Sequence, residues 1–94
     1  MTINNYTQDV NINSEVEVTA WFFRPEPQGR RLKSFPKRMT WGGRDYNFVE
    51  DGLRYLVQRG QQLVQLFDMS DGQSTYRLRQ DGDHWTLIGI KGGF

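Results

Sequence analysis

Hydrophobic and polar residues alternate along much of this chain, which is the pattern of β-strands with one buried face. The alternation is clearest on either side of the Gly42-Gly43 pair, within residues 35–48. A glycine pair between two such runs predicts a two-residue hairpin turn, because glycine adopts positive φ without a Cβ clash. With these glycines at the turn, the apolar side chains share one face, which holds Met39, Trp41, Tyr46 and Phe48.

Three more strands are predicted in the last third of the chain, where Asp71-Gly72 and Asp81-Gly82 separate alternating runs. Asp-Gly between such runs is a strong hairpin signal. Taking each Asp-Gly as the central pair of its turn places Phe67 beside Tyr76, and Tyr76 beside Leu87, in one apolar stripe. The predicted strands cover residues 63–69, 73–80 and 83–90.

An earlier strand is predicted at residues 15–23, where small or apolar side chains alternate with polar ones. Trp21 and Phe23 fall on the otherwise polar face, so the end of this strand carries bulky apolar groups on both faces. We expect this second apolar group to be covered, either by the rest of the domain or by a partner. Two prolines and a glycine then predict a surface loop over residues 24–31.

The stretch after the glycine hairpin admits two interpretations. Asp51-Gly52 forms another tight turn that leads into a strand, or Asp51 caps a short helix near 51–59 that stops at Gly60. Tyr55 and Val57 favour the strand, since aromatic and β-branched residues are enriched in strands.

The 94 residues are expected to form an all-β fold, an antiparallel meander of five or six strands curled into a small SH3-like barrel or roll. Residues 1–14, rich in Asn and Thr, are expected to form a flexible N-terminal arm, and residues 15–94 a single β domain. Only 36% of residues are hydrophobic, so the 14% that are aromatic must supply much of the core.

Several classes of protein are disfavoured by composition. The chain has no Cys, which excludes disulfides and thiolate metal sites. It has no run of about 18 apolar residues, the length of a membrane span, and its polar start lacks the features of a signal peptide. We therefore expect a cytoplasmic protein without a membrane partner.

The net charge of +1 conceals an uneven distribution. Residues 24–44 carry seven cationic side chains against one carboxylate, a net charge of +6. Residues 1–23 carry −3 and residues 45–94 carry −2. A basic segment between acidic flanks is a candidate surface for an anionic partner.

Two motifs resemble a known family. They are Phe35-x3-Met39-x-Trp41-x-Gly43-Arg44-x-Tyr46 and Tyr76-x-Leu78-x2-Asp81-Gly82-x-His84-Trp85-x-Leu87. Together they resemble a family of small bacterial β-rich domains of unknown function, in which an aromatic-x-Trp-x-Gly-Arg-x-Tyr hairpin precedes an Asp-Gly-x-x-Trp-x-Leu strand. The resemblance implies a β domain without assigned chemistry. It also implies a link to nucleic-acid processes, because similar segments occur attached to DNA-damage-tolerance proteins of the polymerase type. Met39 departs from the family, which tends to have an aromatic residue there.

Catalytic machinery is not predicted. The one histidine, His84, falls beside Arg79 in the predicted register, with no acidic group to orient it as a base. Asp81 and Asp83 lie close to it in sequence, but hairpins use such residues without any metal. We expect a non-enzymatic chain with no cofactor and no metal.

Two kinds of partner fit these patterns. Exposed Trp and Arg side chains are typical of protein interfaces, and unpaired sheet edges favour self-association. Single-stranded nucleic acid is the alternative, because cations and aromatic rings together bind phosphates and bases. We expect a non-catalytic protein-binding or accessory module, homodimers included, with the basic segment 24–44, Arg77 and Arg79 serving the alternative. The candidate partner-binding residues are Trp21, Phe23, Arg24, Arg30, Arg31, Lys33, Arg38, Arg44, Arg77 and Arg79.

Overall fold

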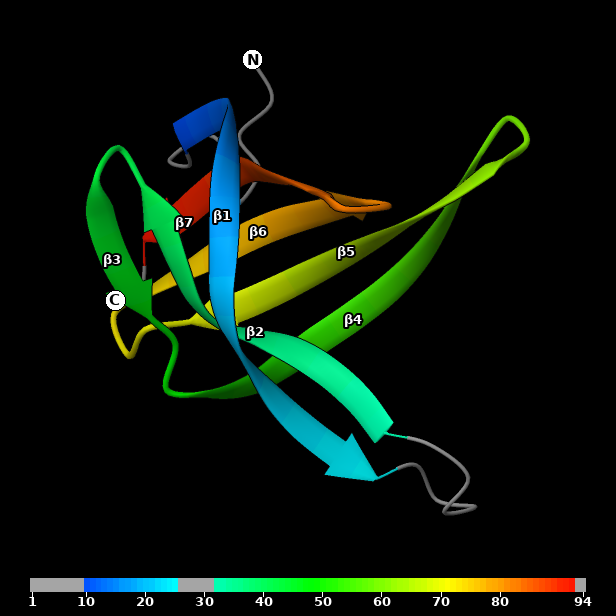
Figure 1. Ribbon diagram of the computed structural model, residues 1–94. Coiled ribbons are helices and arrows are strands. Elements are labelled where there is room, and N and C mark those ends of the chain that lie inside the picture. The colour runs from blue at the N-terminus through cyan, green and yellow to red at the C-terminus, as the bar shows by residue number, and fades with distance from the viewer. Residues whose placement is uncertain (1–9, 26–31, 93–94) are drawn as a thin grey trace.

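The structure, a computed structural model, describes residues 10–25 and 32–92, and within them seven antiparallel strands form one sheet (Figure 1). The predicted all-β fold is confirmed, with seven strands where five or six were expected and no helix at 51–59. Their order across the sheet is β3-β2-β1-β7-β6-β5-β4. The strands are β1 (Val10–Pro25), β2 (Leu32–Trp41), β3 (Arg44–Asn47), β4 (Glu50–Arg59), β5 (Gln62–Ser70), β6 (Ser74–Asp81) and β7 (His84–Gly92).

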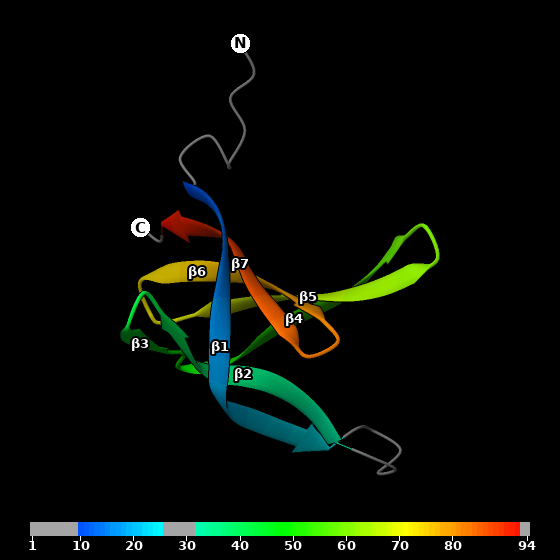
Figure 2. The ribbon, with the colours of Figure 1, turned by 45° about the horizontal axis from the view of Figure 1, so that its top comes forward.

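Strand β1 joins two meanders by changing its neighbour halfway along. Its first half, residues 10–16, pairs with β7, and its second half, residues 17–25, pairs with β2. The strand bends where the neighbour changes, and its second half runs past the start of β7 (Figures 1 and 2). Residues 10–14, the last part of the expected arm, lie in this strand, and residues 1–9 lie outside the described residues.

The bends in β1 follow from irregular pairing. The register with β2 shifts on both sides of Ala20, and the register with β7 shifts between Asn11 and Ser14. Such bulges add a residue to one strand and increase its local twist. Asn13, at the second irregularity, has a φ of 55°, a left-handed conformation that Asn tolerates better than most residues.

The sheet curls but does not close into a barrel. In a flat sheet, seven strands about 4.8 Å apart would separate the edge strands by roughly 29 Å. Strand β3 ends at Asn47 and β4 begins at Glu50, and this link reaches at most about 11 Å. The two edges therefore have to approach each other at this point, although β3 and β4 do not pair. The expected SH3-like barrel is thus an open, curled sheet.

The Gly42-Gly43 hairpin forms as predicted. Both glycines have positive φ, 61° and 78°, and Met39 pairs with Tyr46 while Trp41 pairs with Arg44. Met39 is fully buried, so the apolar face of the hairpin points into the core.

The register at the two Asp-Gly sequences was predicted wrongly. Phe67 pairs with Leu78 rather than Tyr76, and Leu78 pairs with Leu87, so next to its turn each register is displaced by two residues. Beyond the bulge between Arg77 and Leu78, Tyr76 pairs with Ile90 rather than Leu87. The reason is the position of the aspartate, which precedes the central pair instead of belonging to it. The Asp71 carboxylate accepts hydrogen bonds from the backbone N–H groups of Gln73 and Ser74, both at 2.8 Å. Because the displacement is an even number of residues, the predicted faces are correct.

The tight turn considered at Asp51-Gly52 does not form. Both residues lie in β4 at a register shift, and β4 pairs with β5 through a turn at Gly60-Gln61. Gly52 sits against the backbone of β5: a Cβ added there would meet the carbonyl oxygen of Asp68. A strand therefore replaces the helix alternative, and this glycine permits a close backbone approach.

The core fills the inner side of the curl and is rich in rings, as the composition predicted. Phe35 of β2 meets Phe67 of β5 edge to face, with 6.0 Å between ring centroids. Phe48 lies 5.5 Å from the ring of Tyr76. These contacts join the two meanders across the curl. The buried cluster consists of Val16, Val18, Phe35, Met39, Phe48, Phe67, Met69, Tyr76, Leu78, Trp85 and Leu87.

Candidate functional site

An open groove of about 680 Å³ lies beside the middle of β1, and we call it the β1 groove. Two glycine turns border it, Gly42-Gly43 and the turn containing Gly82. It forms because β1 continues beyond the start of β7: Val16 is the last residue of β1 that pairs with that strand. Among the residues that line the groove are Trp21, Trp85, Glu15, Glu17, Asp83 and His84.

The second half of β1 has a free edge beside this groove. In the described part of the chain, residues 17–25 pair with β2 on one side only. On the other side, the outward-directed backbone N–H and C=O groups of residues 17–23 are available to a further strand.

Trp21 and Phe23 project from this half of β1, and both are exposed. The exposed fraction is 40% for Trp21 and 63% for Phe23. Trp21 pairs with Pro36 of β2, which is fully buried. Phe22, which lies between Trp21 and Phe23 in the strand, packs on the core. Of the two expectations for Trp21 and Phe23, cover within the domain is excluded by these exposures. Cover by a partner stays a prediction.

The charge of the β1 groove is acidic, which the sequence did not suggest. Three carboxylates line it, those of Glu15, Glu17 and Asp83. The one group there that gains positive charge on protonation is His84, whose Nδ1 lies 3.5 Å from Oε2 of Glu15. Both side chains are more than three-quarters exposed, so their pairing is weak. The predicted absence of an acidic partner for His84 was wrong, since Glu15 comes from a strand distant in sequence.

Cations of the basic segment are spread over several places. The Arg24 guanidinium carbon lies 5.2 Å from the ring centroid of Phe35, and that of Arg44 lies 5.3 Å from the ring of Tyr46. Arg38 donates a hydrogen bond from Nε to the hydroxyl of Thr19 at 3.0 Å.

The remaining candidate cations of the basic segment are Arg44, Lys33, Arg30 and Arg31. Arg44 pairs with Trp41 across the hairpin, and its guanidinium lies over the ring of Tyr46. Lys33 lies in β2 opposite Arg24, and Arg30 and Arg31 lie outside the described residues.

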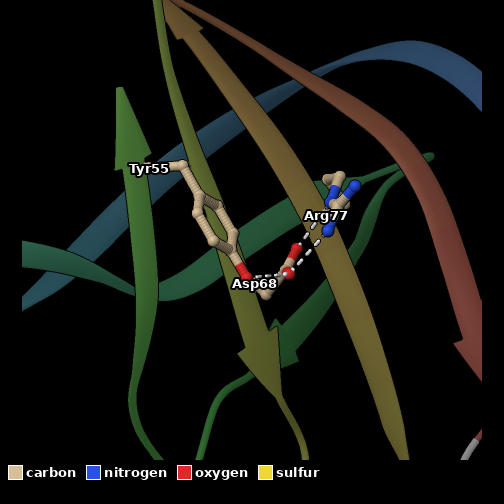
Figure 3. Close-up of polar contacts among 3 residues, drawn as sticks. All are labelled: Tyr55, Asp68 and Arg77. Atoms are coloured by element: carbon tan, nitrogen blue, oxygen red, sulfur yellow. Dashed lines mark hydrogen bonds and ion pairs between the residues drawn. The ribbon is translucent and has the colours of Figure 1, made fainter. Parts of the chain in front are cut away.

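Arg77 and Arg79 share the outer face of β6, and both bind acidic groups of the same chain. Arg77 donates from Nε and Nη2 to the two carboxylate oxygens of Asp68, at 2.7 and 2.8 Å (Figure 3). Tyr55 of β4 donates its hydroxyl to the same carboxylate at 3.2 Å. Arg79 binds Asp81 at 2.8 Å. The cluster in Figure 3 therefore ties β4, β5 and β6 together.

Two pKa shifts occur together at the Asp71 turn. Burial raises the pKa of Tyr76 to about 12, and the hydrogen bond that its hydroxyl donates to Asp71 at 2.8 Å acts in the same direction, as does the negative charge of Asp71. Partial burial opposes ionisation of Asp71. The hydrogen bonds that this carboxylate accepts from Ser74, Gln73 and Tyr76 outweigh that effect and lower its pKa. The pair locks a turn, and nothing in its arrangement activates a nucleophile.

Sequence reasoning missed a second exposed apolar region on the β4–β5 hairpin. Leu53, Leu56 and Leu63 are each at least 60% exposed, and Tyr55 is 38% exposed. Tyr55 and Val57 had been assigned only a strand preference. The available signal was the density of leucine and aromatic residues on a strand whose turn, Gly60-Gln61, was not recognised.

The fold and surface define an open, curled antiparallel β-sheet domain with an acidic groove. No family model matches the chain, and neither a curated protein nor a solved structure matches it. Within the described ranges, no three His, Asp or Glu side chains gather as a metal site. That same part of the chain contains no helix long and apolar enough to cross a bilayer. The family resemblance stays a prediction.

Proposed function

We propose that this chain is a non-catalytic module that binds an extended segment of a protein partner along the β1 groove. The observation that carries the proposal is the free edge of residues 17–23 next to that groove, with Trp21 exposed where the two meet. A partner strand added to such an edge gains backbone hydrogen bonds, and side-chain pockets supply its specificity.

The groove favours a basic segment. Glu15, Glu17 and Asp83 would attract Lys or Arg side chains of the partner and steer its approach. Trp21 offers a flat ring on which a guanidinium or an apolar side chain packs, and Trp is enriched among the residues that dominate binding energy.

Single-stranded nucleic acid is the less favoured partner. The carboxylates of the groove would repel phosphates, and Arg77 and Arg79 already bind Asp68 and Asp81. The described cations of the basic segment 24–44 lie on β1, β2 and β3 rather than on β6. An oligonucleotide would therefore have to bind through Arg24, Arg38, Arg44 and the cations near them.

The test is selection of a displayed random peptide library on the purified protein, followed by affinity measurement of the selected peptides. We expect basic peptides, with Trp21→Ala weakening their binding at least about ten-fold, the effect of losing a dominant contact. Leu63→Ala is the matched control, because Leu63 is also exposed but lies on β5. Equal binding to the Trp21→Ala variant would remove the proposal.

The nucleic-acid alternative has a separate test. A labelled single-stranded oligonucleotide is titrated at several salt concentrations. Affinity that falls steeply with salt, because counterions are released, would favour the nucleic-acid alternative. Charge reversal at Arg30 and Arg31 would then abolish that binding.

A further inference from the structure

Strand β4 is an unprotected edge of the sheet. Among residues 10–25 and 32–92 its one pairing partner is β5, and the outer part of the β4–β5 hairpin projects beyond the other strands (Figures 1 and 2). Leu56 on this edge is 65% exposed and Leu53 60%. Edge strands of monomeric proteins are normally shortened, charged or bulged to prevent pairing with another chain. The regular part of β4, residues 53–59, has seven consecutive paired positions and no proline.

The hydrogen-bonding direction along β4 follows from its turn. Arg59 and Gln62 close the two-residue turn, so Arg59, Val57 and Tyr55 exchange backbone hydrogen bonds with β5. The intervening residues direct their N–H and C=O groups to the free edge. They are Arg54, Leu56 and Gln58, evenly spaced along the regular segment.

We infer that β4 pairs antiparallel with β4 of a second copy, about a two-fold axis through Leu56. Leu56 is the midpoint of the regular segment, so this register pairs all seven positions with their counterparts in the second copy. A register displaced in either direction runs into the bulge between Glu50 and Leu53 or into the turn at Gly60. The resulting interface is isologous and closes as a dimer.

The side chains are self-complementary in this register. Leu56 meets Leu56 of the second copy, and Tyr55 meets Val57, an aromatic and β-branched pair of the kind that stabilises sheets. Arg54 faces the neutral Gln58, and Arg59 faces Leu53. No like charges oppose each other, whereas a register centred on Arg54 would place two arginines together.

This inference does not rest on the proposed function. The β1 groove and the β4 edge belong to different strands, separated in the sheet by β7, β6 and β5. No residue of β4 lines the groove, so pairing at this edge uses none of the groove's residues.

Sedimentation equilibrium of the whole chain over a wide concentration range tests the edge. We expect a monomer–dimer equilibrium that Leu56→Arg weakens at least about ten-fold, because it opposes two like charges on the axis. Leu63→Arg is the matched control, since Leu63 is 64% exposed on the neighbouring strand and does not lie on the free edge. A chain that stays monomeric at its highest soluble concentration overturns the inference. An equal effect of Leu63→Arg also overturns it, because the contact would then use a face of the sheet.

A pair of substitutions at one position tests the register. Gln58→Glu places a carboxylate opposite Arg54 twice in the dimer, which should tighten dimerisation about three- to five-fold, and Gln58→Lys should weaken it similarly. Unchanged affinity in both variants overturns the Leu56-centred register. Hydrogen exchange, which needs no variant, should show the amides of Arg54, Leu56 and Gln58 gaining protection as concentration rises. Exchange at these amides that does not depend on concentration overturns the pairing.

Discussion

At the scale of single residues, Asp71 shows how one carboxylate sets a strand register. By accepting hydrogen bonds from the N–H groups of Gln73 and Ser74, it caps the turn from the preceding position. Its second carboxylate oxygen accepts the hydroxyl of Tyr76, which is buried in the core. The turn and the core are therefore joined through one side chain.

The raised pKa of Tyr76 predicts a loss of stability at alkaline pH. The pKa of this phenol is 10.0 in the unfolded chain and about 12 in the folded protein, so its contribution to the free energy of unfolding is complete below pH 10 and is lost as pH rises toward 12. Two pKa units correspond to about 2.7 kcal/mol. Urea unfolding at a series of alkaline pH values measures the loss. Tyr76→Phe keeps the ring without the ionisable group, so its stability should fall less over this range. Parallel curves for the two proteins would contradict the prediction.

The turn at Asp71 also marks a limit of sequence reasoning. The period of two along β5, β6 and β7 correctly assigned faces to Phe67, Tyr76, Leu78 and Leu87. It did not assign their partners, because Asp-Gly fits a turn either as its central pair or with Asp one position earlier. The choice depends on hydrogen bonds of the aspartate that no hydrophobic pattern encodes.

At the scale of elements, the Asp68 cluster holds the projecting hairpin to the sheet. Asp68 is central to this cluster, because its carboxylate accepts hydrogen bonds from Tyr55 of β4 and from Arg77 of β6 (Figure 3). The Asp68 side chain is only 15% exposed, so its ion pair with Arg77 is shielded from water more than the Arg79–Asp81 pair.

Removing the charge of Asp68 should destabilise the protein. Asp68→Asn leaves the Arg77 guanidinium without its carboxylate, at a cost of about 1–3 kcal/mol. Asp81→Asn is the control, because Asp81 is 38% exposed and its pair with Arg79 should contribute less than about 1 kcal/mol. The free energy of unfolding in urea measures both. Equal losses would show that the cluster has no special role.

Of the candidate site, the sequence predicted single side chains better than their surroundings. Trp21 and Phe23 follow from alternation within one strand, and their exposure agrees with the face assigned to them. The β1 groove depends on where β7 begins relative to β1, a pairing between residues about seventy positions apart. No local pattern specifies that position, so the acidic groove was not foreseen.

At the scale of the whole molecule, packing rather than connection length holds the curl. The link after β3 is short, but the contacts across the curl are made by rings: Tyr46 lies 5.7 Å and Phe48 5.5 Å from the ring of Tyr76. Phe35 makes the equivalent contact with Phe67 on β5. The sequence predicted a curled sheet with an aromatic core, whereas the open gap between β3 and β4 depends on long-range geometry.

Lengthening that link should therefore change stability little. Inserting roughly four Gly and Ser residues between Val49 and Glu50 should cost less than about 1 kcal/mol, since the entropy of loop closure grows slowly with length. Phe35→Ala, which removes a ring across the curl, should cost about 3–5 kcal/mol. Thermal and urea unfolding compare the two. An insertion as harmful as Phe35→Ala would mean that the short link holds the curl.

The glycine turns beside the β1 groove have a consequence for how its selectivity can change. A Cβ added at Gly42, Gly43 or Gly82 would meet no atom within 4 Å. New side chains at this rim would therefore point into empty space, and their main penalty would be a left-handed backbone, about 1 kcal/mol each. Successive replacements there would let the domain acquire different binding preferences while its interior stays the same, which makes it a natural scaffold for diversification.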